Sequence, residues 1–184
     1  MRPIFTVHAG EYLVAAKIEE TFPLIRVWIP SKDDGIDLLV TDKNCRDSIS
    51  LQIKFSKDYL GNGVKPEIAT TIKSGGWWTF KREKIVKSPA DYWVLVTYSF
   101  HNRDSDLIVI KPIDLIRLYD ALGNQERINS YVWVTNSKNC WETRGLKKDE
   151  QLLVTQDRFT DETRSLKKYL NNWSMIQSLC VSNS

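Results

Sequence analysis

Three polar side chains interrupt two apolar segments near the start of the chain. Asp37 lies within residues 36–40, and Gln52 and Lys54 lie within residues 49–55. Carboxylate and amide oxygens are the hard ligands that Mg²⁺ prefers. An ammonium group beside such a cation can steady an anionic nucleophile or a phosphate. Because a bound metal polarises a phosphoryl oxygen and activates water, these residue types suit the hydrolysis of a phosphodiester.

The two segments are predicted to pair as a β-hairpin, because both are apolar and polar turn residues join them. Side chains alternate along a strand, and opposite residues of an antiparallel pair point the same way. The polar side chains should therefore emerge together, on the face opposite to the apolar set of Ile36, Leu38, Val40, Leu51, Ile53 and Phe55. One register that keeps this pattern places Asp37 directly opposite Lys54.

A fourth polar residue lies on a predicted helix over residues 9–22, which Pro23 ends. Glu11 precedes the apolar positions of that helix at spacings that share one face. A carboxylate on the buried side is costly unless it is paired or binds a cation. The alternative is an ordinary first-turn acid, which the helix macrodipole favours.

The order of the stretches GEYLVAAKI, GID and QIK resembles the PD-(D/E)xK nuclease superfamily, which includes restriction endonucleases, Mrr-like enzymes and archaeal Holliday junction resolvases. The resemblance implies that Glu11, Asp37, Gln52 and the backbone carbonyl of Ile53 hold Mg²⁺, or Mn²⁺ in its place. It also implies that Lys54 helps to activate water. Gln52 stands at the acid position of the third motif, as in Mrr-like members, and the Pro-Asp pair is absent.

The resemblance extends to residue 100 and implies a metal-dependent DNA endonuclease. The lack of a signal peptide and of a disulfide pattern predicts a cytoplasmic location. It leaves a homodimer open, since many relatives act as dimers. The alternative is a non-catalytic module of the same fold that binds nucleic acid or a protein, or a purely structural domain. The net charge of +3 permits an anionic partner without requiring one.

Residues 73–87 combine basic side chains with a pair of tryptophans, Trp77 and Trp78. One interpretation is a nucleic-acid surface, where cations contact phosphates and aromatic rings stack on bases. The other is a buried tryptophan pair beside a solvated basic face, which we favour for the tryptophans. The basic residues remain candidates for binding DNA: Lys73, Lys81, Arg82 and Lys84.

The remaining pattern predicts an α/β fold, with strands and helices mixed along the chain. With the resemblance, this becomes a restriction-endonuclease-like αβββαβ core, in which helices flank a mixed central sheet. Further strands are expected over residues 24–30, 91–100, 106–110, 130–135 and 151–155, further helices over 112–122 and 160–173, and a loop over 56–76. We expect a single domain over 1–184, with a nuclease-like core over 1–111 and an elaboration over 112–184 packed on it.

Composition excludes several other classes of protein. The chain is 42% hydrophobic and 27% charged, which is typical of a globular domain. Its two histidines argue against His-based metal sites and Ser-His-Asp catalysis, and its three widely spaced cysteines argue against a disulfide framework. The N-terminal residues lack the pattern of a signal peptide, and no apolar run reaches the roughly 18 residues that a membrane span needs.

Overall fold

The computed structural model describes residues 4–32, 34–57, 70–99, 104–123 and 125–181, and within them it has two β-sheets. The large sheet has the strand order β1-β2-β3-β5-β6, and the small sheet has the order β4-β7-β8. The large sheet comprises β1 (Arg26–Trp28), β2 (Leu38–Thr41), β3 (Ser48–Lys57), β5 (Tyr92–Ser99) and β6 (Asp104–Ile110). The small sheet comprises β4 (Ile72–Lys81), β7 (Arg127–Thr135) and β8 (Cys140–Glu142).

The fold belongs to the α/β class, as predicted, because helices flank a sheet that mixes both strand directions. Strands β1, β2 and β3 form an antiparallel meander, β3 runs parallel to β5, and β5 is antiparallel to β6. The helices are α1 (Ile4–Thr21), α3 (Arg82–Val86), α4 (Pro112–Ala121), α5 (Lys148–Thr155) and α6 (Ser174–Val181). Among the described helices, none is long and apolar enough to cross a membrane.

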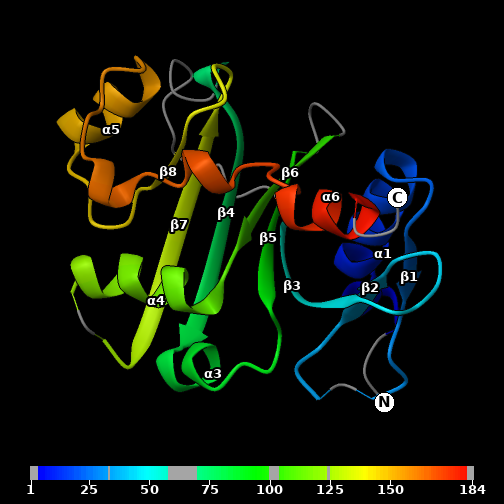
Figure 1. Cartoon of the computed structure of the whole chain (residues 1–184). Coiled ribbons are helices and arrows are strands. Elements are labelled where there is room, and N and C mark those ends of the chain that lie inside the picture. The colour runs from blue at the N-terminus through cyan, green and yellow to red at the C-terminus, as the bar shows by residue number, and fades with distance from the viewer. Residues whose placement is uncertain (1–3, 33, 58–69, 100–103, 124, 182–184) are drawn as a thin grey trace.

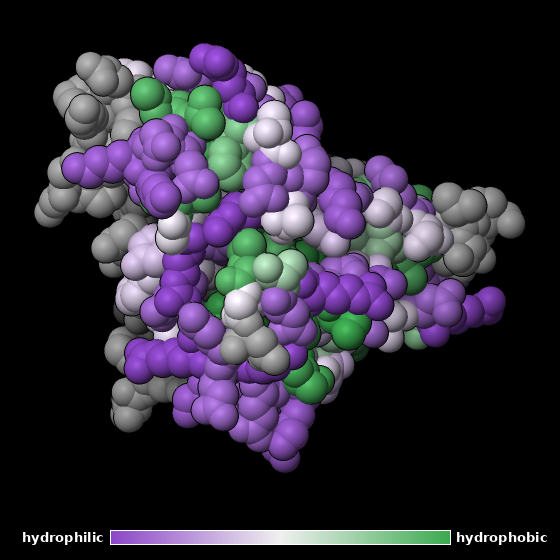
Figure 2. Space-filling model, turned by 90° about the vertical axis from the view of Figure 1, so that its left-hand side faces the viewer, coloured by the Kyte–Doolittle hydropathy of each residue, from purple (hydrophilic) through white to green (hydrophobic). Residues whose placement is uncertain are grey.

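The large sheet is covered on both faces (Figure 1). Helices α1 and α6 pack on one face, where Val14, Ile18 and Ile176 join apolar side chains of β2, β3, β5 and β6. The small sheet, α3 and α4 cover the other face, where Trp78 and Leu115 meet side chains of β5 and β6. Figure 2 shows that hydrophilic side chains dominate the face it presents, with hydrophobic ones in small patches.

The C-terminal part of the chain completes both layers around the N-terminal core. Strand β7 pairs with β4 along nearly its whole length, from Ile72↔Thr135 to Lys81↔Arg127. Helix α6 returns to the large sheet beside α1 (Figure 1). The described residues after 111 are therefore packed on the described residues before them.

Helix α1 crosses β3 at very short range. A Cβ atom added at Gly10 would lie 2.6 Å from the Cβ of Phe55, which is closer than real Cβ contacts. Glycine therefore lets the helix backbone approach the strand at this point.

Three predictions about the elements are wrong. Part of the loop expected over 56–76 is strand, because β3 runs to Lys57 and β4 begins at Ile72; residues 58–69 lie outside the described part of the chain. The strand expected over 151–155 belongs to α5, whose N-terminus is capped by Glu150 accepting from the Lys147 N–H at 2.7 Å. The helix expected over 160–173 consists of two short 3-10 turns. Strand β8 and helix α6 were not expected.

Candidate functional site

Asp37 directly precedes strand β2 and lies one residue beyond the last residue that pairs with β3. The last pair of the ladder is Leu38↔Leu51, and the Asp37 N–H donates to the Leu51 carbonyl at 2.8 Å. Continuing this register places Asp37 level with Gln52. The register therefore differs by two residues from the allowed one that places Asp37 opposite Lys54, and its parity is as predicted.

Beyond this pair, hydrogen bonds to the Asp37 carboxylate replace the next backbone hydrogen bonds between the two strands. Its Oδ2 accepts from the Gln52 amide Nε2 at 2.9 Å and from the Ile53 backbone N–H at 2.6 Å. Gln52 is buried and Asp37 is half-buried. The structure thus brings together Asp37, Gln52 and the backbone of Ile53, three of the predicted ligand positions.

The oxygen atoms of Asp37, Gln52 and the Ile53 backbone are of the type that binds Mg²⁺. A strand residue directs its N–H and C=O to the same edge, so the Ile53 carbonyl points toward the side that Asp37 occupies. The Gln52 amide presents its N–H to Asp37, and half a turn about its last torsion presents the oxygen instead. No group of three His, Cys, Asp or Glu gathers among the described residues, so a cation here would depend on amide and carbonyl oxygens beside Asp37.

Glu11 is buried, with 8% of its surface exposed, as its helical spacing predicted. It lies on α1 with Val14 and Ile18, and this helix covers the face of the large sheet that carries Leu51 and Ile53. Gln52 and Lys54 point to the opposite face. The structure therefore does not bring Glu11 to the side of the sheet on which Gln52 and Lys54 lie. Its role as a metal ligand stays a prediction.

Lys54 follows Gln52 on the same face of β3 and is half-buried. Its Nζ lies 5.5 Å from the ring centroid of Trp93, which is a cation–π contact. The Trp78 indole donates to the Lys54 carbonyl at 3.1 Å and so ties β4 to this part of β3. Sequence reasoning missed Trp93, because its position in a long apolar run indicates only a core residue.

Gln52 and Lys54 line a cavity of about 760 Å³ between β3, β4 and α3. The lining carries four lysines against two carboxylates, beside the rings of Trp78, Phe80 and Trp93. Its charged residues are Lys54, Lys81, Lys84, Lys87, Asp34 and Glu83. The predicted DNA-binding lysines Lys81 and Lys84 therefore lie beside the candidate site.

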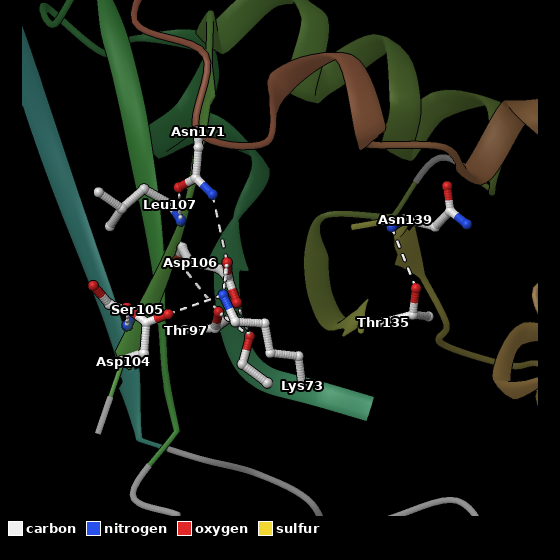
Figure 3. Close-up of polar contacts among 10 residues, drawn as sticks. Lys73, Thr97, Asp104, Ser105, Asp106, Leu107, Thr135, Asn139 and Asn171 are labelled. Carbon is white, nitrogen blue, oxygen red and sulfur yellow. Dashed lines mark hydrogen bonds and ion pairs between the residues drawn. The ribbon is translucent and has the colours of Figure 1, made fainter. Parts of the chain in front are cut away.

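The two other predicted DNA-binding residues are held in ion pairs. Lys73 lies 2.8 Å from Asp106 and 3.0 Å from Asp104, at the end of β4 remote from Lys81 (Figure 3). Burial lowers the pKa of Lys73, but hydrogen bonds to these carboxylates outweigh it, so the pKa is raised. Arg82 donates through both terminal nitrogens to Asp120. Neither ion pair could be predicted from the sequence, because each partner lies on an element that is distant along the chain.

Comparison with known proteins adds no relative to this description. No family model, no curated protein and no solved structure matches the chain.

Proposed function

We propose that the protein is a metal-dependent endonuclease that hydrolyses phosphodiester bonds in DNA. The contact between Asp37, the Gln52 amide and the Ile53 backbone supports this proposal, because it gathers three oxygen-bearing groups at one open end of the β2–β3 ladder. The lysine-lined cavity that begins at Gln52 offers room for a phosphate backbone.

The residues divide the work by their chemistry. Asp37, Gln52 and the Ile53 carbonyl would hold Mg²⁺, and the bound cation would supply polarisation of the phosphate and activation of water. Lys54 would place its charge against the phosphate from beside Gln52. Lys81 and Lys84, on the other wall of the cavity, would attract the DNA backbone.

The neutral amide at Gln52 has a consequence for metal binding. A carboxylate at that position would add a second negative charge beside Asp37, and the amide does not. We therefore expect weaker Mg²⁺ binding than in a Gln52→Glu variant.

A second candidate is a non-catalytic module that binds nucleic acid. The Asp37 carboxylate already accepts two hydrogen bonds within the chain, which stabilises the site without a cation. This module would bind DNA through the lysines of the cavity, with a strong dependence on salt and none on Mg²⁺.

Cleavage of supercoiled plasmid in Mg²⁺ tests the nuclease. We expect Asp37→Ala and Lys54→Ala to lower the rate at least about 100-fold, because each removes a group that stabilises the transition state. Asp47→Ala and Lys43→Ala are matched controls, since both side chains are exposed in the turn that joins β2 to β3.

Undiminished cleavage in both site variants would refute the assignment. Calorimetric titration with Mg²⁺ separates the two candidates. Heat that is lost in Asp37→Ala favours the nuclease, whereas DNA binding without metal binding or cleavage favours the module.

A further inference from the structure

The outer face of the small sheet carries aromatic and basic side chains in register. Residues opposite one another in β4 and β7 point to the same face, and three consecutive pairs on this face are Trp77↔Tyr131, Thr79↔Asn129 and Lys81↔Arg127. The intervening residues Trp78 and Phe80 point inward to the core between the sheets. We call these six outward residues the aromatic–basic face.

Trp77 is unusually exposed for a tryptophan in the middle of a strand, with 42% of its surface accessible. Its ring centroid lies 6.2 Å from that of Tyr131, with the planes inclined by 41°. Further along the same face, Trp133 packs against Trp141 and Val154, which lie on β8 and α5. Helix α5 thus covers one end of the outer face, and Trp77 lies where that cover stops.

The other end of the aromatic–basic face is polar and basic. Thr79, Lys81 and Arg127 are exposed, and they line a hollow of about 780 Å³ together with Glu83 and Glu126. Trp77 and Lys81 are four residues apart on one strand, a separation of about 14 Å. An aromatic ring is therefore followed by cations within the length of a short oligonucleotide.

We propose that the aromatic–basic face binds single-stranded nucleic acid. Unpaired bases would stack on Trp77 and Tyr131, and the phosphates that follow would contact Lys81 and Arg127. A duplex keeps its bases stacked on each other, so only an unpaired strand can stack its bases on these two rings. The six residues include no aliphatic side chain, and the two cations complement a phosphate backbone better than an apolar peptide.

The face is continuous with the candidate site. Thr79, Lys81 and Glu83 line both the hollow and the cavity that contains Gln52 and Lys54. Where the proposed nuclease function holds, the substrate has an unpaired strand next to the bond that is cut. This last step rests on the proposed function, whereas binding of a single strand does not.

Fluorescence anisotropy with a labelled oligothymidylate of about 12 nucleotides tests the proposal, using the full chain in the presence of EDTA. We expect Trp77→Leu to weaken binding at least about 10-fold, because it removes a stacking ring. Trp28→Leu is the matched control: Trp28 is 48% exposed and lies on β1, at the far edge of the large sheet. Arg127→Glu, at an exposed position, should weaken binding without removing a packed side chain.

Three results would overturn the proposal: no binding by the unaltered protein at low salt, equal affinities for Trp77→Leu and the unaltered protein, or duplex binding that depends equally on Trp77. Circular dichroism shows whether each variant is folded, and Arg127→Glu decides the outcome if Trp77→Leu is not. The Asp37→Ala variant should keep full affinity for the oligonucleotide. Absence of cleavage by the unaltered protein, together with intact binding of the oligonucleotide, would count against the nuclease alone.

Discussion

Glu142 is a single residue whose charge state links stability to pH. It is 1% exposed and accepts hydrogen bonds from the Ser130 hydroxyl and from the backbone N–H groups of Tyr131 at 2.9 Å and Arg144 at 3.1 Å. Burial raises its pKa from 4.5 to about 7, although these hydrogen bonds and the charge of Arg164 oppose the shift. The folded protein thus holds a proton on Glu142 more tightly than the unfolded chain does.

We predict that Glu142 lowers the free energy of unfolding as pH rises. The contribution of protonated Glu142 to the free energy of unfolding is fully present below pH 4.5. It is lost as pH rises through about 7, and the free energy of unfolding falls by about 3 kcal/mol. Glu142→Gln keeps an oxygen for both backbone N–H groups and has no charge to titrate. Urea unfolding at several pH values should show this slope in the unaltered protein and in the exposed control Glu20→Gln, but not in Glu142→Gln. Equal slopes in all three would contradict the prediction.

The candidate site could be predicted in part, because alternation along a strand fixes which face each side chain takes. That rule brought Asp37 and Gln52 to one place. It left the register open, since a slip of two residues keeps every side chain on its face. The partners of Lys73 could not be predicted. Asp104 and Asp106 lie on β6, and they contact Lys73 on β4 only because of how the two strands are arranged in the fold.

At the scale of elements, dense apolar runs and clear end signals were enough to predict β5, β6 and α4. Pro112 opens α4, and Gly123 follows it with a φ of 116°, a conformation that glycine adopts without strain. The wrong assignment of a strand arose at a short apolar run. Residues 151–155 suit a strand as well as a helix, and the Lys147–Glu150 cap that decides for α5 lies just before them.

The close crossing of α1 and β3 makes a prediction with an unusual sign. Alanine normally stabilises a helix over glycine by about 1 kcal/mol. At Gly10 the new methyl group would collide with Phe55, and such overpacking costs about 1–3 kcal/mol. We therefore expect Gly10→Ala to lower the free energy of unfolding by about 1 kcal/mol in urea titration. Ala9→Gly, at the exposed neighbouring position, reports the propensity effect alone, and a gain of stability in Gly10→Ala would exclude the tight crossing.

At the scale of the whole molecule, the fold of residues 1–111 depends on the residues that follow. The core between the sheets includes Leu115, Ile128, Val132 and Val134, all from residues after 111. Burial of such side chains contributes about 2 kcal/mol each, and four of them approach the total stability of a typical domain, about 5–15 kcal/mol. A domain boundary at residue 111 therefore divides one hydrophobic core.

We predict that a fragment of residues 1–111 does not fold cooperatively. Without β7, strand β4 loses its partner in the small sheet, and the inner face of the large sheet is left open. Thermal unfolding followed by circular dichroism should show a broad, non-cooperative transition, in contrast to the full chain. Adding the fragment of residues 112–184 should restore a sharp transition. A sharp transition in the first fragment alone would show that the core is self-sufficient.

The pairing of β4 with β7 also sets the order in which a nascent chain can fold. The parallel pair of β3 and β5 forms only after the crossover through β4 and α3 has been synthesised. Strand β4 can pair in the small sheet only after β7 has left the ribosome. Helix α6, which covers the large sheet beside α1, is synthesised after the other described helices and strands. During synthesis the apolar surfaces of both sheets therefore stay open until β7 and α6 have been made, and such surfaces are where chaperones bind and aggregation begins.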